Sequence, residues 1–227
     1  MAIKVDSSIQ ARWHGGKRNL SAVTAIVFHY TGNSGTTASA RGNANYFAST
    51  DRKASAHIVV DTKPVAYLCV PLDTVAWSVG DGSAGKFGKL VNNYNSVSIE
   101  MVSCTDASGH YYIPFETIRN AYEVYHWLIK QLPNIKYTVR HYDVSLKQCP
   151  APYIDEKKWA EFKDWMVNGL EMVEQSYIIV DGKEKPVERI LKGGVNYIKV
   201  RDFVKAMAGV HDMEISSKGS IPVLTSE

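Results

Sequence analysis

The chain has 227 residues, of which 45% are hydrophobic and 22% are charged, and its formal net charge is +3. This composition indicates a folded protein with one sizeable core and room for a small companion domain. The charge disfavours nucleic acid as the main partner, and no apolar run approaches the ~20 residues needed to span a membrane. The N-terminus lacks the apolar segment of a secretory signal, so we expect cytoplasmic accumulation without a signal peptide.

The first predicted elements are a buried strand and a helix. Residues 23–30 form an almost continuous β-favouring run, with His29 near its C-terminal end. Residues 36–37 are both threonine and can cap a helix. The apolar face of that helix carries Ala40, Ala44 and Phe47.

A hairpin and a loop follow. We expect the hairpin over residues 55–71 and the loop at the glycine-rich segment 80–85, which is long enough to shape a groove. Residues 95–102 then alternate as a strand, with valine, isoleucine and methionine on one face. Glu100 lies on the other face with two serines, and an acidic residue in so apolar a strand requires an explanation.

Three further elements complete the first unit. A helix is expected over residues 116–132, because apolar residues recur there at helical spacing. Residues 137–140 form a short strand that ends directly before His141. Asp155 can cap a last helix with a buried aromatic stripe.

The composition becomes polar and acidic near residue 168, which predicts a domain boundary. We expect a first domain over residues 1–168, a linker over 169–175 and a small α+β domain over 176–227. The elements expected in the small domain are strands at 177–180, 187–191 and 195–200, a helix at 203–208 capped by Asp202, and a stop at Gly209.

The segment from Arg140 to Pro150 contains the strongest chemical signal. It holds His141 and Cys149, and His29 is a third candidate ligand far upstream. Two imidazoles and one thiolate can hold Zn²⁺ and leave a fourth position open for water, which is the pattern of a catalytic site. A buried, hydrogen-bonded histidine and an inert core thiol are the alternatives for such residues.

The chain has three cysteines in unrelated contexts, which disfavours a disulfide framework. Cys69 and Cys104 are interpreted as core thiols. Amide hydrolysis at a zinc site also needs a proton carrier and a group that stabilises the oxyanion. Glu100 suits the first role and Lys147 the second, although a salt-bridged strand carboxylate and a solvated loop lysine are the alternatives.

Four residues are candidates for substrate contact. Trp77 can line a cleft or belong to the core. Asn93 and Asn95 can bind a peptide or close a turn. His57 is included as a substrate contact, with hydrogen-bonded support of the site as the alternative and metal ligation disfavoured.

Five segments of the chain, in the same order, resemble the zinc N-acetylmuramoyl-L-alanine amidases of the type-2 amidase and peptidoglycan-recognition-protein superfamily, which includes phage endolysins. The matching segments are 26–31, 55–61, 76–77, 95–100 and 140–150. They span residues from about 20 to 165. The resemblance implies an α/β fold in which a central mixed β-sheet is flanked by helices, with a zinc groove on one side.

The same resemblance implies cleavage of the amide between N-acetylmuramic acid and the L-alanine of the peptidoglycan stem peptide. By carry-over, one Zn²⁺ is held by His29, His141 and Cys149. Glu100 moves protons and Lys147 polarises the carbonyl. Some family members have a catalytic tyrosine just before the histidine that matches His57. Alanine occupies that position here, which shifts proton transfer to the glutamate.

Residues 176–227 resemble the small domain found beside the N-terminal region of copper amine oxidases and in clostridial wall proteins. The matching segments are 180–183 and 197–203. This resemblance implies wall attachment or homo-oligomer formation, without copper chemistry, because His211 is the one histidine in that region.

The expected protein is a phage or prophage endolysin, or an autolysin freed on lysis, that acts on the cell wall after release. One alternative is a non-catalytic peptidoglycan-recognition module on the same fold, but relatives of that kind lack the thiolate that Cys149 offers. A regulatory binder of a polymerase is a second alternative, and nothing in this near-neutral sequence favours it.

Overall fold

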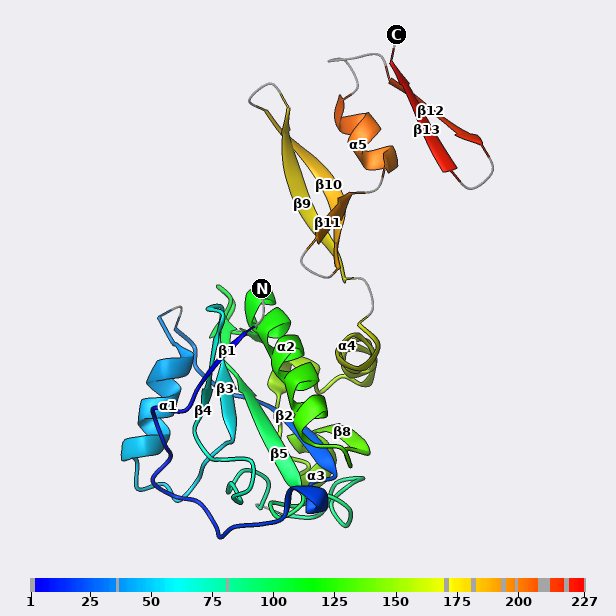
Figure 1. Ribbon diagram of the computed structural model, residues 1–227. Coiled ribbons are helices and arrows are strands. Elements are labelled where there is room, and N and C mark those ends of the chain that lie inside the picture. Colours follow the sequence, from blue (N-terminus) through cyan, green and yellow to red (C-terminus); the bar gives the residue numbers. More distant parts are fainter. Residues whose placement is uncertain are drawn as a thin grey trace. The chain divides into compact units, whose positions relative to one another are not determined.

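The computed structural model describes residues 3–35, 37–80, 82–169, 172–180, 183–192, 195–198, 200–207, 213–218 and 221–226. The chain forms two compact units, one up to residue 163 and one from residue 164 onward (Figure 1).

The first unit is built on a six-stranded mixed sheet with the strand order β1-β4-β3-β5-β2-β8. Its strands are β1 (Lys4–Asp6), β2 (Ala25–Tyr30), β3 (Ile58–Val60), β4 (Val65–Leu68), β5 (Ser96–Met101) and β8 (Tyr137–Arg140). The central strand β2 runs parallel to β5 and β8, and β3 pairs antiparallel with β4 as the expected hairpin. The prediction of a mixed central sheet is confirmed.

Helices cover both faces of this sheet. They are α1 (Ala40–Ser49), α2 (Phe115–Gln131), α3 (His141–Ser145) and α4 (Glu156–Asn168), and a two-stranded ladder joins β6 (Cys104–Thr105) to β7 (Tyr111–Tyr112). On one face, the Phe28 ring meets Tyr125 of α2 and Phe162 of α4. On the other face, Ala40 and Ala44 of α1 pack in one cluster with Val59 of β3.

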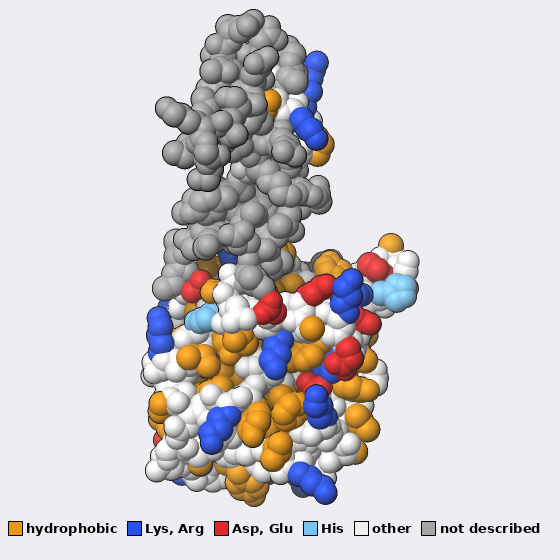
Figure 2. Space-filling model, turned by 90° about the vertical axis from the view of Figure 1, so that its right-hand side faces the viewer, with side chains coloured by type: hydrophobic (Ala, Val, Ile, Leu, Met, Phe, Trp, Pro, Cys, Tyr) orange, Lys and Arg blue, Asp and Glu red, His pale blue; other side chains and the backbone are white. Residues whose placement is uncertain are grey.

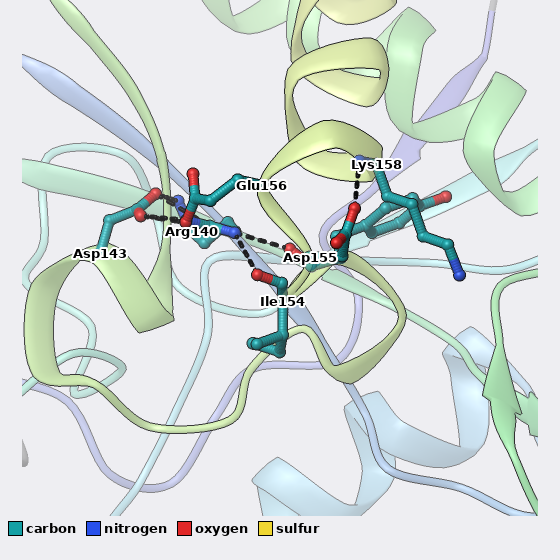
Figure 3. Close-up of polar contacts among 7 residues, drawn as sticks. Arg140, Asp143, Ile154, Asp155, Glu156 and Lys158 are labelled. Carbon is teal, nitrogen blue, oxygen red and sulfur yellow. Dashed lines mark hydrogen bonds and ion pairs between the residues drawn. The ribbon is translucent and has the colours of Figure 1, made fainter.

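Two helix caps show where sequence patterns were reliable and where they were not. The α1 cap is Ser39, whose hydroxyl accepts a hydrogen bond from the Gly42 N–H at 3.1 Å. The predicted cap at residues 36–37 is therefore wrong for residue 37, and residue 36 lies outside the described residues. Asp155 caps α4 as predicted, accepting from the Lys158 N–H at 2.9 Å (Figure 3).

The strand β5 is buried on both faces, which the alternation of its sequence did not predict. Ser96 and Ser98 are almost fully buried, although they lie on the face opposite to Val97 and Ile99. Ser96 Oγ donates to the Asn92 carbonyl at 2.7 Å, so its hydroxyl keeps a partner without water. The face of β5 that carries the serines is therefore buried and does not face solvent.

The second unit contains a three-stranded antiparallel sheet, a helix and a hairpin. Its elements are β9 (Met172–Val180), β10 (Lys183–Lys192), β11 (Val195–Ile198), α5 (Val200–Met207), β12 (Met213–Lys218) and β13 (Ile221–Ser226). Residues 172–175 of the expected linker belong to β9. Asp202 lies inside α5 and does not cap it, because the helix begins two residues earlier. The expected stop at Gly209 lies outside the described residues.

On the face of the molecule shown in Figure 2, basic and acidic side chains are interspersed, with hydrophobic side chains between them. This distribution agrees with the small net charge of +3. Among the described residues, every helix is too short or too polar to traverse a lipid bilayer.

Candidate metal centre

The C-terminal ends of three parallel strands bring the predicted site residues together. His29 is near the end of β2 and is directly paired with Glu100 of β5, while His141 follows β8 immediately. The ends of parallel strands meet at one edge of a sheet, which is where α/β proteins place their ligands. His29 and Glu100 therefore point from neighbouring positions on the same face.

A short loop returns Cys149 to this edge. The helix α3 ends at Ser145, and the following residue, Leu146, adopts a left-handed φ of 64° and turns the chain. The Tyr142 N–H then donates to the Cys149 carbonyl at 2.8 Å, and the Cys149 N–H donates to the Lys147 carbonyl at 2.7 Å. These backbone bonds hold the thiol beside the histidine that opens the helix.

The three candidate ligands form a compact cluster. One donor atom from each of His29, His141 and Cys149 lies within 4.8 Å of the other two. Cys149 Sγ and His29 Nδ1 are 3.7 Å apart. Tetrahedral zinc, with bonds of about 2.0–2.1 Å to nitrogen and 2.3 Å to sulfur, separates such donors by about 3.6 Å. The donor types, and the separation of Cys149 Sγ from His29 Nδ1, fit one Zn²⁺ ion.

The surroundings also keep His29 in the form that binds metal. Only 2% of its surface is exposed. Burial lowers its pKa well below the usual value, and the charges of His141 and Lys147 lower the pKa further. A metal ligand must offer a neutral imidazole. The buried position therefore favours ligation at neutral pH.

Glu100 has the properties of a proton carrier. Its Oε1 lies 3.9 Å from His29 Nδ1, and 15% of its side chain is exposed. Burial raises its pKa to about 8, although the charges of Lys147 and Arg52 act in the opposite direction. Its Oε2 is buried without a hydrogen-bond partner in the described part of the chain. A carboxyl group with such a pKa can accept a proton and release it near neutrality.

A cleft of about 280 Å³ gives access to this cluster. Its lining includes the five residues that the sequence analysis assigned to metal binding and catalysis, which are His29, Glu100, His141, Lys147 and Cys149. Trp77 also lines the cleft. The arrangement therefore combines a metal-ligand cluster, a carboxyl group and an ammonium group on one accessible wall.

Arg140 anchors the ligand-bearing segment from inside the protein (Figure 3). Its guanidinium donates to Asp143 Oδ1 at 2.7 Å and to the carbonyls of Tyr153 and Ile154 at 2.8 and 2.9 Å. Asp143 also accepts from the Arg140 N–H, which closes the first turn of α3. The sequence analysis placed Arg140 in a matching segment but gave it no role. Arginine is rarely buried unless it is paired, and its partners cannot be identified from the sequence.

Two of the predicted substrate contacts line open space and two do not. Trp77 lines the metal cleft, and Asn93 lines a neighbouring pocket. Asn95 instead closes a turn, accepting from the Asn92 N–H and donating to the Leu90 carbonyl. In the described structure, Asn95 lines neither pocket.

His57 is fully buried, so the prediction that it contacts substrate does not agree with its position. Its Nδ1 lies 3.2 Å from Ser98 Oγ and its Nε2 lies 2.8 Å from Arg18 Nη2 and 3.1 Å from the Thr74 carbonyl. Arg18 also donates to the carbonyls of Leu72, Asn93, Tyr94 and Ser96. This network joins the residue directly before β3 to β5 and to the loop before β5, and hydrogen-bonded support is the role that its geometry allows.

Comparison with known proteins identifies the family. Residues 19–152, more than half of the chain, match the N-acetylmuramoyl-L-alanine amidase family Amidase_2. The chain belongs to this family. The chain is 35% identical over 156 residues to the N-acetylmuramoyl-L-alanine amidase BlyA of Bacillus subtilis (strain 168), covering 64% of this chain and 41% of BlyA. It is 32% identical over 197 residues to CwlL of Bacillus licheniformis, covering 83% of this chain and 53% of CwlL. The chain thus spans about half the length of these relatives.

Solved structures show the same fold. The catalytic domain of XlyA has a TM-score of 0.56 at 26% identity, with 73% of this chain and 99% of that domain covered. A mutant endolysin from Bacillus subtilis has a TM-score of 0.56 at 27% identity, with 72% of this chain and 99% of that chain covered. The fold of the first unit is therefore that of an endolysin amidase.

Proposed function

We propose that this chain is a zinc-dependent N-acetylmuramoyl-L-alanine amidase that cleaves the amide between N-acetylmuramic acid and the L-alanine of the stem peptide. The observation that carries the proposal is the convergence of donor atoms from His29, His141 and Cys149 within 4.8 Å at the wall of a cleft. Membership of the amidase family supports the reaction type.

The residues of the cleft divide the work of amide hydrolysis. A zinc ion held by His29, His141 and Cys149 would supply Lewis-acid polarisation and lower the pKa of a bound water. Glu100 takes a proton from the attacking water as a carboxylate and then gives it to the leaving nitrogen as a carboxylic acid. The Lys147 ammonium donates toward the carbonyl oxygen as negative charge develops there.

Metal removal and restoration test this proposal. We expect exhaustive chelation to abolish release of new alanine amino termini from purified walls, and one equivalent of Zn²⁺ to restore it. Activity that survives complete metal removal would contradict zinc dependence. Wall binding without any cleavage by the zinc-loaded chain would instead favour the non-catalytic recognition module.

The ligand set is tested by a matched pair of cysteine variants. Cys149→Ser removes the thiolate, so we expect loss of both bound zinc and activity. Cys104→Ser removes a buried cysteine that lies outside the cluster, and it should retain both. Metal analysis of the purified proteins and mass spectrometry of digested walls give the two readouts. Full zinc content in Cys149→Ser would contradict the assignment.

We further propose that the enzyme acts on bacterial peptidoglycan after release from the cell, as a lytic enzyme. Residues 176–227 are proposed to serve wall attachment or self-association. The support for this second assignment is the sequence resemblance of segments 180–183 and 197–203 to a small domain of clostridial wall proteins.

A further inference from the structure

A second pocket opens beside the metal cleft. It has a volume of about 530 Å³ and shares part of its lining with the cleft. The shared residues are Arg52, Ala54, Trp77, Ser78 and Lys147. The remaining lining residues are Lys53, Gly80 and Asn93. A substrate that reaches from the metal cluster along the cleft therefore enters this pocket next.

The described lining of this pocket is basic. It contains Arg52, Lys53 and Lys147 and no described carboxylate. Among the described residues, neither Arg52 nor Lys53 forms an ion pair, and the neighbouring Asp51 is paired with Arg12 at 2.7 Å. The positive charge of Arg52 also extends into the cleft, where it stabilises the charged form of Glu100. Arg52 shares a hydrogen bond with the Tyr46 side chain, but no described carboxylate lies within ion-pair distance of Arg52 or Lys53, so both charges can attract an anionic ligand.

Aromatic rings give the basic pocket a firm wall. Trp77 stacks on Trp13 with ring centroids 6.4 Å apart and an angle of 22° between planes. The Lys53 ammonium lies 5.8 Å from the Trp13 centroid, within the range of a cation–π contact. Lys53 also has a left-handed φ of 56°, a conformation that few residues other than glycine adopt. Backbone strain of this kind is often kept where a side chain must be aimed at a ligand.

Asn93 adds a neutral donor to the pocket. Its Oδ1 accepts from the N–H groups of Ser78 and Val79 at 3.0 and 2.8 Å, which fixes the amide plane. Its Nδ2 lies where a Cβ on Gly80 would approach to 2.7 Å, so the glycine makes room for it. The amide N–H groups can therefore donate to an anionic oxygen beside the three cations.

The chemistry of the substrate decides which anion reaches this place. The lactyl carboxyl of N-acetylmuramic acid is consumed in the scissile amide, so the negative charges near that bond are the carboxylates of the stem peptide. The second stem residue is a glutamate linked through its side chain, and its α-carboxyl is either free or amidated. At ~3.5 Å per residue, this group lies about 7 Å along the stem from the cleaved bond.

We propose that the basic pocket binds this free carboxylate, so that the enzyme prefers stems with a free α-carboxyl on the second residue over stems in which it is amidated. This inference rests on the proposed amidase function and adds a stem preference to it. Arg52 and Lys53 are the residues assigned to the preference, and Arg52 offers two parallel N–H donors to a carboxylate.

The test compares two soluble muropeptides that differ only in this group, using the zinc-loaded full chain. We expect kcat/KM to be about tenfold higher for the free acid, mainly through a lower KM. This is the size of effect expected when one charge-assisted hydrogen bond is gained. The preference should shrink as salt is added. The double variant Arg52→Gln/Lys53→Gln should bring the ratio close to one. Lys130→Gln, which removes an exposed lysine at the end of α2, should keep the wild-type ratio.

A binding measurement separates this inference from the proposed reaction. The free stem tripeptide and its amidated form are titrated calorimetrically into wild type and into the double variant. Tighter binding of the acid by wild type, lost in the double variant, supports the pocket even if neither muropeptide is cleaved, an outcome that would defeat the amidase proposal alone. Equal rates and equal affinities for acid and amide in wild type, or an unchanged preference in the double variant, would overturn the inference while leaving cleavage intact.

Discussion

Glu100 occupies a position where a carboxyl group can change protonation state during a reaction. Burial raises its pKa to about 8, and Oε1 stands 3.9 Å from a candidate metal ligand. In Glu100→Gln the side chain keeps its shape but can no longer carry a proton. We expect kcat to fall by about 10²–10⁴-fold, the usual range for a lost general acid–base group.

A measurement of bound zinc distinguishes loss of proton transfer from loss of the metal, because Glu100 is not one of the three clustered ligands. Bound zinc in Glu100→Gln should match wild type. Glu116→Gln, an exposed glutamate in the first turn of α2, is the control and should keep both zinc and activity. A Glu100→Gln enzyme with near-normal kcat would show that another group moves the proton.

His57 makes stability depend on pH. Burial lowers its pKa from 6.5 to about 3, with a further contribution from the charge of Arg18. Between these pH values the unfolded chain binds a proton that the folded chain does not. The stabilisation is therefore complete above pH 6.5 and is lost as the pH falls toward 3, by at most about 1.4 kcal/mol per pH unit.

Urea unfolding of the metal-free protein at pH 7 and at pH 5 measures this effect. Wild type should lose more stability between the two pH values than His57→Gln, with a difference of about 1–2 kcal/mol. Chelator is kept present so that metal binding does not add its own pH dependence. Identical losses in the two proteins would mean that His57 is not held neutral by the fold.

At the scale of elements, the glycine-rich loop is shaped by direct backbone contact with α3. The Gly85 N–H donates to the Val144 carbonyl at 3.0 Å, and the Phe87 N–H donates to the Asp143 carbonyl at 2.7 Å. A Cβ at Gly85 would lie 2.3 Å from the Asp143 carbonyl oxygen. The loop can approach the ligand-bearing helix this closely only because position 85 has no side chain.

Gly85→Ala should therefore destabilise the protein by about 1–3 kcal/mol, the range for an overpacked site, and lower the melting temperature by several degrees. Gly16→Ala is the matched control, since a Cβ there meets nothing within 4 Å, and it should melt close to wild type. Thermal unfolding of both variants, with and without zinc, provides the comparison. A Gly85→Ala protein as stable as Gly16→Ala would contradict the close packing.

At the scale of the whole molecule, the contribution of residues 176–227 to wall binding is measurable. We expect residues 1–168 to cleave soluble muropeptides as the full chain does, because the residues proposed for metal binding and catalysis lie within the first unit. Sedimentation with purified walls should show weaker retention of residues 1–168 than of the full chain. Equal retention, with both proteins monomeric by light scattering, would remove both roles proposed for the second unit.

Sequence patterns predicted most strands of the central sheet well because each of them has a local signature, whereas the three-residue edge strand β1 was not predicted. The run that ends near His29, the alternation that contains Glu100 and the short strand before His141 all appear within two residues of the observed strands. The grouping of the five site residues at one edge followed from their order and the family resemblance. In the structure these five residues line one cleft.

What the sequence could not predict depends on contacts between distant segments. His57 looks accessible in a hairpin, but Arg18 and Ser98, 39 and 41 residues away, enclose its ring. Arg140 has no local pattern that reveals its four partners in two helices and the turn between them. The basic pocket likewise arises where residues 52–53 and the loop bearing Lys147 meet, and no single segment shows it.

Cys149 and His29 come from points 120 residues apart in the chain. If both bind the same ion, the ion cross-links the two ends of this long segment, so unfolding requires release of the ion as well. Zinc then binds only the native state, and it raises the free energy of unfolding by about 2.7 kcal/mol when the free zinc concentration is a hundred times the dissociation constant. Resistance to unfolding and to proteolysis would rise and fall with metal supply, independently of any turnover.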